Sequence, residues 1–400
     1  MSFALDGWSA LGEKVSVSLI DQVAVLVGHN GAGKSAILEG FETISLLAVG
    51  SFRPPPQFDI YNIPKILDVE ILTPTKRRLQ YHYELTVLSS FYNDELDSSI
   101  DDPVTEISED SIFVWNDSCQ YIDGAQEHLW TTERGMRNVG GVVPVGGGTS
   151  LRARGKSKSD FGKNKSLLEE MYWVYVVLHG VRLLEKTPIR QTYSRRRCLL
   201  QISGKRVFST SDSSYGKVHS LARRIFRLKT EEFNEFESIC QRIGLGSKIT
   251  LQEFVLKQEF KEITKNENEE YVISVLLDGV NIGLLSDGTL RVLSLLIELI
   301  ISHPSMTTII EEPETQIHPG MLRKLLKEIK AYTFGENLII STHSPQVVTW
   351  TSPDKINLVY RNDEKTIVRK LDEEEIQQVV DYLDEEGNLG EWLYSGILDE

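Results

Sequence analysis

Gly28, Gly33, Lys34 and Ser35 have the spacing of a phosphate-binding loop, in which a glycine and four further residues precede Gly-Lys-Ser. The β-branched run 23–27 precedes this loop, and apolar residues follow it at helical spacing. A glycine-rich turn could match this spacing by chance, but a chance match would not require a strand pattern before the loop and a helix pattern after it. Because free amides and the helix dipole favour a polyphosphate, we expect Lys34 to reach the β- and γ-phosphates and the Ser35 hydroxyl to bind Mg²⁺.

Two successive carboxylates end a second buried pattern, TTIIEEPETQIHPG at 307–320. The run 308–310 suits a buried parallel strand, and such strands end at the sheet edge where ligands bind. We expect Glu311 to hold Mg²⁺ through water, and Glu312 to orient and deprotonate the attacking water. A solvated acidic turn is the other interpretation, which the phosphate loop disfavours. Glu311 stands where most strands of this kind end in Asp.

His343 follows the next apolar strand pattern, NLIISTHSP at 337–345. It is therefore expected at the same sheet edge as the two carboxylates, where it could contact a γ-phosphate. A lone histidine is more often an incidental surface or core residue, and only the place of His343 after this strand favours a role in the site.

Ser286-Asp287-Gly288 stands before a strongly apolar helix pattern, LRVLSLLIEL. An Asp-Gly turn is the simplest interpretation. The free amides at such a helix start also form a second anion site, yet one nucleotide needs only one phosphate loop. A second amide cradle is best explained if it caps a γ-phosphate from the opposite side.

The composition is that of an ordinary globular protein. Of the 400 residues, 40% are hydrophobic and 25% are charged. The apolar stretches are too short to span a bilayer and no signal-peptide pattern opens the chain, so we expect a cytoplasmic protein without membrane contact. Cys119, Cys198 and Cys240 fit neither a disulfide framework nor a paired zinc site. A net charge of −15 disfavours a surface that attracts nucleic acid everywhere.

The elements that must position these residues favour an α/β fold split by an insertion. We expect residues 1–90 and 249–400 to form the split domain, with the strand patterns KILDVEIL and LQYHYELTVL completing the antiparallel part of its sheet near the nucleotide. Residues 91–248 are expected to form a mainly helical lobe with an acidic loop and a loop rich in Gly, Lys and Arg. Two of its helices are expected over 166–186 and within 217–243.

A basic run lies in the expected lobe, where Arg195, Arg196 and Arg197 stand near Tyr193. Clustered cations beside an aromatic residue suit a nucleic-acid contact. They suit a solvated face or a protein docking patch equally well, because clusters of cations need not meet phosphates.

Together, the motifs GHNGAGKS, LSDGTLR, IIEEPETQIHP and STHSP resemble the ABC-type ATPase superfamily. The likeness is to its branch of RecF-like and SMC-like heads and of stand-alone AAA-type ATPases of bacterial anti-phage defence. It covers residues 1 to about 90 and about 249 to 400. The resemblance implies an ABC-type P-loop ATPase head, a mixed sheet with flanking helices, that binds ATP and Mg²⁺.

The resemblance also assigns roles to single residues. It implies that ATP is bound by Asn30, Gly31, Gly33, Lys34 and Ser35. It implies that Ser35 and Glu311 hold Mg²⁺, that Glu312 is the catalytic base, and that His343 is the switch histidine. Ser286 and Gly288, in the signature motif, are implied to act on the ATP held by a partner subunit, so that two heads sandwich ATP in a homodimer or a higher even oligomer.

The function that the resemblance implies is ATP hydrolysis that closes and reopens two heads. Relatives with a fused nuclease carry a TOPRIM domain after the switch histidine, and this chain ends soon after His343. We therefore expect a separate effector, a nuclease or a toxin, in a system like those of PARIS-type and Septu- or retron-associated ATPases. A RecF-like repair ATPase that loads on DNA and a nucleotide-gated scaffold with little turnover are the alternatives. Gln57 and Gln80 are both candidates for the Q-loop glutamine.

Overall fold

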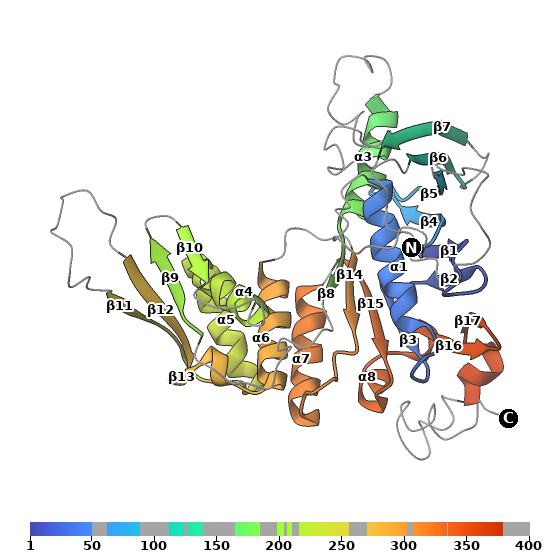
Figure 1. Cartoon of the computed structure of the whole chain (residues 1–400). Helices are drawn as coiled ribbons and strands as arrows, with labels where there is room; N and C mark the ends of the chain where they lie inside the picture. Colours follow the sequence, from blue (N-terminus) through green and yellow to red (C-terminus); the bar gives the residue numbers. More distant parts are fainter. Residues whose placement is uncertain are drawn as a thin grey trace, which may run out of the picture. The chain divides into compact units, whose positions relative to one another are not determined.

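The chain divides into two compact units (Figure 1). The first consists of Met1–Leu183, Pro304–Glu311 and Gly335–Glu400, and the second of Leu184–His303 and Glu312–Phe334. The computed structural model describes residues 1–49, 62–88, 112–123, 127–138, 165–184, 198–203, 206–209, 216–255, 270–301, 307–333 and 335–378. The acidic loop 94–110, Gln57 and the run Arg195–Arg197 lie outside these residues. The loop rich in Gly, Lys and Arg that the sequence predicts over 134–165 lies outside them except at its ends, where 134–138 belong to a strand and Lys165 begins a helix.

A sheet with parallel central strands lies in the first unit. Its strands, in their order across the sheet, are β17 (Lys365–Lys370), β16 (Ile356–Asn362), β3 (Val23–Val27), β15 (Asn337–Thr342), β14 (Thr307–Glu311) and β8 (Val181–Leu184). The neighbours from β16 to β14 pair in parallel, and β17 turns back antiparallel to β16. Three of the central strands therefore end at one edge, as the sequence predicts for β3, β14 and β15.

Helix α1 (Lys34–Ala48) covers one face of these strands. Its apolar residues pack with the alternate strand residues that face them, and the buried set includes Ala24, Leu26, Ile37, Leu38, Phe41, Ile44, Ile309 and Ile339. On the other face, Val348 of α8 (Pro345–Thr349) packs with Val25 and Val27. Strands buried on both faces read as continuous β-branched runs, which explains why VAVLV and TTIIE predict this sheet.

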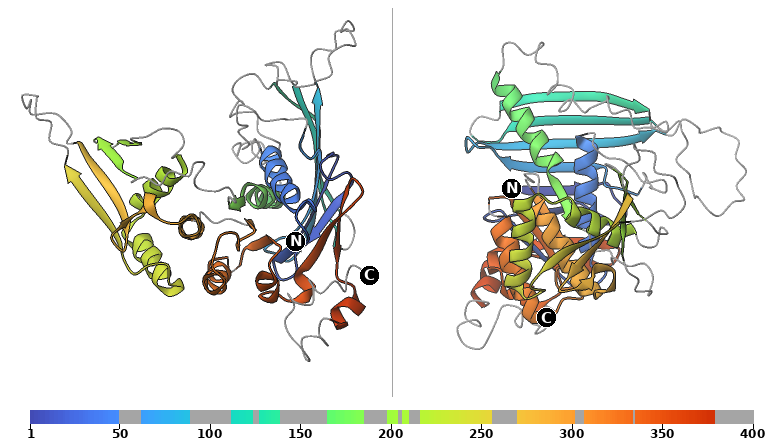
Figure 2. Two further views of the ribbon diagram at one scale, coloured as in Figure 1. Left: turned by 60° about the horizontal axis from the view of Figure 1, so that its bottom comes forward. Right: turned by 90° about the vertical axis from the view of Figure 1, so that its left-hand side faces the viewer.

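The second sheet of the first unit is antiparallel throughout. Its strands, in order, are β2 (Val15–Ser18), β1 (Ser2–Asp6), β4 (Ile66–Leu72), β5 (Arg78–Leu88), β6 (Ile112–Tyr121) and β7 (Glu127–Asn138). Helices α1 and α3 (Lys165–His179) lie across one face of it (Figure 2). Phe41 of α1 stacks on Phe3 of β1 with ring centroids 3.9 Å apart, so one helix serves the cores of both sheets.

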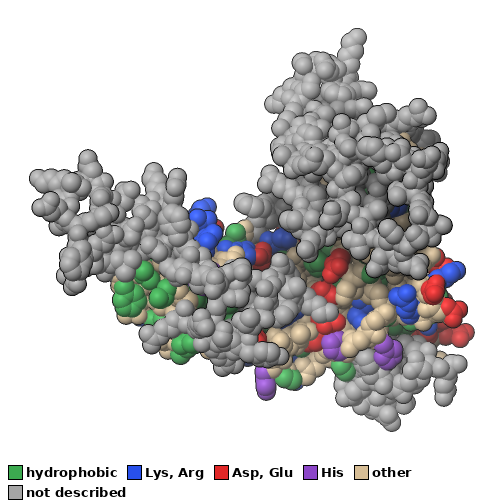
Figure 3. Space-filling view, viewed as in Figure 1, with side chains coloured by type: hydrophobic (Ala, Val, Ile, Leu, Met, Phe, Trp, Pro, Cys, Tyr) green, Lys and Arg blue, Asp and Glu red, His purple; other side chains and the backbone are tan. Residues whose placement is uncertain are grey.

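The second unit packs helices against a smaller antiparallel sheet. The strand order is β10 (Arg206–Ser209), β9 (Leu200–Ser203), β12 (Glu270–Leu277) and β11 (Ile249–Val255), and β13 (Val280–Asn281) also pairs with β12. The helices are α4 (Gly216–Phe226), α5 (Thr230–Ile243), the single turn η2 (Ile282–Leu284), α6 (Asp287–Ile300) and α7 (Pro319–Tyr332). Exposed apolar side chains gather over β11 to β13 (Figure 3), where Leu251, Phe254 and Val280 are accessible.

The region 91–248 differs from the mainly helical lobe that the sequence predicts. Its described residues contain five strands, β6 to β10, besides three helices, and they belong to both compact units. The sequence did not predict strand β6, because polar residues such as Asp117 interrupt its apolar pattern. Asp117 is buried and accepts a hydrogen bond from the Tyr81 hydroxyl at 3.4 Å. The helix expected over 166–186 ends at His179, because Gly180 interrupts it and the chain continues as β8.

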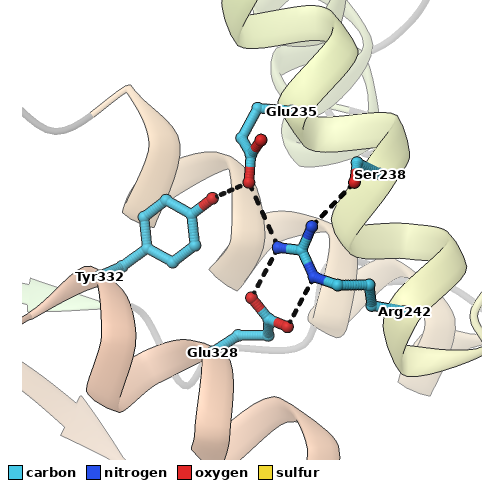
Figure 4. Close-up of polar contacts among 5 residues, drawn as sticks. All are labelled: Glu235, Ser238, Arg242, Glu328 and Tyr332. Atoms are coloured by element: carbon cyan, nitrogen blue, oxygen red, sulfur yellow. Dashed lines mark hydrogen bonds and ion pairs between the residues drawn. The ribbon is translucent and has the colours of Figure 1, made fainter.

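A polar network joins α5 to α7 in the second unit (Figure 4). Arg242 donates to both carboxylate oxygens of Glu328, at 3.0 and 2.9 Å, and also to Glu235 and Ser238. The Tyr332 hydroxyl donates to Glu235 as well. The hydrogen bonds from Tyr332 and then from Arg242 lower the pKa of the Glu235 carboxyl. The network therefore holds α7, which begins soon after the carboxylate pair, against α5.

We predict that Arg242→Met lowers the free energy of unfolding of the second unit by about 1 kcal/mol at pH 7, because a bidentate but partly exposed ion pair is lost. A carboxyl whose pKa is lowered by folding contributes stability above its unfolded pKa and loses it as the pH falls through the folded value. The difference between wild type and variant should therefore shrink below a pH of about 4. Urea unfolding at pH 7 and pH 3 measures it, with Arg323→Met on the exposed face of α7 as the control. Equal stabilities of Arg242→Met and Arg323→Met at pH 7 would contradict this role.

Candidate functional site

The phosphate loop joins the end of β3 to the start of α1, as the sequence predicts. Gly31 and Gly33 have φ angles of 84° and 102°, which only glycine adopts without strain. A Cβ at Gly33 would lie 2.4 Å from the Thr366 Oγ1 of β17, and one at Gly28 would lie 1.9 Å from the Val359 carbonyl oxygen of β16. The loop is thus held closely against the hairpin β16–β17, and both glycines are required for that approach.

Lys34 and Ser35 form the first turn of α1 and point to different partners. The Lys34 ammonium donates to the carbonyl oxygens of Gly28 and His29, at 2.6 and 2.9 Å, and the residue is only 5% exposed. This arrangement keeps a cation over the loop, where the helix amides also favour an anion. Asn30 and Gly31 lie exposed in the same loop.

The Ser35 hydroxyl donates a hydrogen bond to Glu311 Oε1, across 276 positions of sequence. Glu311 is the last residue of β14 and is 4% exposed. A hydroxyl and a carboxylate are hard oxygen ligands, and they fit Mg²⁺, which takes one or two protein oxygens and completes its octahedron with phosphate oxygens and water. The structure therefore brings together the two residues that the sequence predicts for a metal.

His343 leaves the sheet at the edge where Glu311 and the phosphate loop also lie. β15 ends at Thr342, which is in register with Val27, the last residue of β3, and Ser341 is in register with Glu311. The Ser344 amide donates to the Thr342 hydroxyl at 2.9 Å, which fixes the turn after the strand. The His343 side chain is exposed there.

Glu312 begins the segment that belongs to the second unit. Its φ angle of 42° is left-handed, an uncommon conformation for a residue other than glycine. Its carbonyl accepts from the Thr315 amide at 3.0 Å, and its Oε2 accepts from the Thr315 hydroxyl at 3.2 Å. The turn continues to His318, which caps α7 by accepting from the Gly320 amide at 3.2 Å. Glu312 is 9% exposed, so its carboxylate is held by the turn rather than solvated.

Helix α6 begins where the sequence predicts, with Ser286 as its N-cap. The Ser286 hydroxyl oxygen accepts from the Thr289 amide at 3.1 Å, and the side chain itself is exposed. A Cβ at Gly288 would lie 2.1 Å from the Gln316 carbonyl oxygen. Gly288 is therefore one point at which α6 touches the turn that follows Glu312.

The predicted residues thus divide between the two units. Residues of the phosphate loop, Glu311 and His343 lie in the first, whereas Glu312, Ser286 and Gly288 lie in the second. Gln80, one Q-loop candidate, lies in β5, where its amide oxygen accepts from Gln120 at 2.8 Å. Sequence reasoning missed Val359 and Thr366 behind the loop, because nothing in their spacing links them to it.

Part of the chain matches the profile of a known protein family. The profile of a family described as "AAA domain, putative AbiEii toxin, Type IV TA system" matches residues 218–349, less than half of the chain, a range that includes Ser286, Glu312 and His343 but not the phosphate loop. Comparison with curated proteins gives no significant match.

Among solved structures, the chain is similar to SMC heads. A head bound to the C-winged helix domain of ScpA is 14% identical with a TM-score of 0.43, over 94% of this chain and 98% of that one. The SMC head domain from Thermotoga maritima is 14% identical with a TM-score of 0.37, over 93% and 98%. A head with an extended coiled coil, bound to a ScpA domain derived from Pyrococcus furiosus, is 13% identical with a TM-score of 0.39, over 96% and 99%. Similarities of this size say little about function.

No helix in the described part of the chain combines the length and the apolar character that crossing a membrane requires.

We predict that Gly288→Ala destabilises the second unit by about 1–3 kcal/mol, because the added methyl group meets a backbone carbonyl that cannot move without displacing the turn. Gly320→Ala is the matched control, since its Cβ would meet nothing nearer than 3.4 Å and its backbone is helical. Urea unfolding followed by circular dichroism compares the two. A Gly288→Ala protein as stable as Gly320→Ala would show that α6 does not press on this turn.

Proposed function

We propose that the chain binds ATP with Mg²⁺ and hydrolyses it. The observation that carries this proposal is the hydrogen bond between Ser35 and Glu311, which joins a phosphate loop to the end of a buried parallel strand. A loop of glycine amides with a buried lysine suits a triphosphate, and the hydroxyl–carboxylate pair suits the cation that accompanies it. Mg²⁺ supplies charge neutralisation between the β- and γ-phosphates when it is bound.

The roles in hydrolysis then follow from the chemistry of each group. Lys34 binds the β- and γ-phosphates, and the amides of Asn30 to Gly33 surround them. Glu312, the residue directly after the metal carboxylate, orients the attacking water and takes its proton. His343, exposed at the same sheet edge as Glu311, contacts the γ-phosphate.

Ser286 and Gly288 serve the nucleotide of a second copy in this proposal. The exposed Ser286 and the amides at the start of α6 that precede Thr289 would form an anion site of their own. A phosphate group bound between this helix start and the loop of another copy would join two chains in a homodimer or a higher even oligomer. ATP binding then closes the assembly, and hydrolysis reopens it.

The biological setting we propose is a bacterial anti-phage or toxin–antitoxin-like system with a separate effector protein. The family whose profile matches residues 218–349 is described as a putative AbiEii toxin of a type IV toxin–antitoxin system, which supports such a setting. The ATPase would act there as the regulator or scaffold of the effector.

Replacing the lysine tests nucleotide binding. We predict that Lys34→Met weakens ATP affinity by roughly 10- to 100-fold, because charge-assisted hydrogen bonds to the phosphates are lost. Lys327→Met, an exposed position on α7, is the control and should bind ATP as wild type does. Titration with a fluorescent ATP analogue in the presence of Mg²⁺ measures both. Equal affinities would mean that the loop does not hold the triphosphate.

Replacing the base separates binding from hydrolysis. We predict that Glu312→Gln lowers the rate of phosphate release by roughly 100- to 10,000-fold while ATP affinity is retained, because an amide cannot accept the proton of the attacking water. The variant should also accumulate with ATP as a closed assembly of doubled mass in light scattering. Glu373→Gln, at an exposed position, is the control. Unchanged phosphate release from Glu312→Gln would remove Glu312 from this role, and ATP binding by wild type without any phosphate release would favour a nucleotide-gated scaffold instead.

A further inference from the structure

Helix α6 contacts the turn that carries Glu312 at two points within the second unit. Near its start, Gly288 lies against the Gln316 carbonyl oxygen, where an added Cβ would approach to 2.1 Å. One turn later, Arg291 Nη2 donates to the Glu312 carbonyl oxygen at 3.0 Å. The two contacts fix both ends of the same short turn.

Both contacted residues have left-handed backbones, with φ angles of 42° at Glu312 and 64° at Gln316. L-residues other than glycine hold such angles only where the surroundings impose them. The side chain of Arg291 is well placed to impose the left-handed angle at Glu312, because it is 6% exposed and its guanidinium donates to the Glu312 carbonyl oxygen. A buried cation that donates to a carbonyl oxygen makes one of the stronger hydrogen bonds in proteins.

The orientation of the Glu312 carbonyl determines where its carboxylate points. The same carbonyl accepts from the Thr315 amide, and Thr315 in turn donates its hydroxyl to Glu312 Oε2. If the carbonyl rotated toward the right-handed region, the amide contact and the carboxylate contact would both be disturbed. Backbone and side chain of Glu312 are therefore fixed together.

We propose that Arg291 is the positioning residue of Glu312. The proposal rests on the proposed function, in which Glu312 activates water. Arg291 acts through the Glu312 carbonyl, so its loss should change the rate of hydrolysis and leave nucleotide affinity unchanged. Because α6 also begins with Ser286, one helix carries the residue that contacts the neighbour's nucleotide and the residue that orients the base of its own chain.

The test is a double-mutant cycle on the full-length protein with ATP and Mg²⁺. We expect Arg291→Met to lower kcat roughly 10- to 100-fold with KM and analogue binding unchanged, as the loss of one charge-assisted hydrogen bond would do. In the Glu312→Gln background the same substitution should cause no further loss, because a residue that acts only through Glu312 has nothing left to position. Arg323→Met is the matched control for the chemical change and should keep the kcat of wild type.

Three results decide the outcome. Wild-type phosphate release and its loss in Glu312→Gln are measured first, and their failure overturns the proposed function whatever Arg291 does. When wild type releases phosphate and Glu312→Gln does not, either of two results overturns the role of Arg291. One is a folded Arg291→Met protein with the kcat of wild type. The other is an Arg291→Met substitution that lowers kcat as much in the Glu312→Gln background as in wild type. If Arg291→Met does not fold, Arg291→Gln is measured in the same cycle, because it keeps an N–H donor and most of the side-chain length. We expect Arg291→Gln to lower kcat less than Arg291→Met would. The same two results would overturn the proposal.

Discussion

The contact between the Ser35 hydroxyl and the Glu311 carboxylate is the interaction on which the rest of the first unit depends. It requires that α1 begin directly above the end of β14, although the two segments are remote in sequence. The parallel order β3, β15, β14 provides this, because it places three strand ends at one edge and lets α1 cover the face that bears Glu311. The glycines of the loop are part of the same constraint, since β16 and β17 leave no room for a side chain at Gly28 or Gly33.

The boundary between the two units falls at one peptide bond, between Glu311 and Glu312. Glu311 ends a strand of the first unit, and Glu312 opens a segment of the second, where α6 holds its carbonyl through Arg291. The Glu311 carboxylate is thus held at the end of a packed strand, whereas the Glu312 carbonyl is held by a helix whose N-cap, Ser286, is exposed.

Local signals in the sequence predicted much of this structure. The strand, loop and helix at 23–48 and the helix that follows Ser286-Asp287-Gly288 are set by residues close to one another, and both are confirmed. Long-range effects were missed. Strand β6 was not predicted, because the buried polar residue Asp117 interrupts its apolar pattern. The contacts of Arg291 with Glu312 and of Thr366 with Gly33 were not predicted either, because no periodic pattern in the sequence indicates them. The catalytic roles stay predictions, because chemistry is not visible in the positions of the groups alone.

Mixing two inactive variants tests most directly whether two copies share each nucleotide. Lys34→Met leaves Ser286 and the start of α6 intact, and Ser286→Arg leaves the phosphate loop intact. In a mixed assembly, the intact loop of one chain would meet the intact helix start of the other, so phosphate release should return. A mixture of Lys34→Met with Glu312→Gln should stay inactive, because loop and base serve the same nucleotide. If the first mixture also stays inactive although both chains are present in one assembly, the nucleotide is not shared between copies.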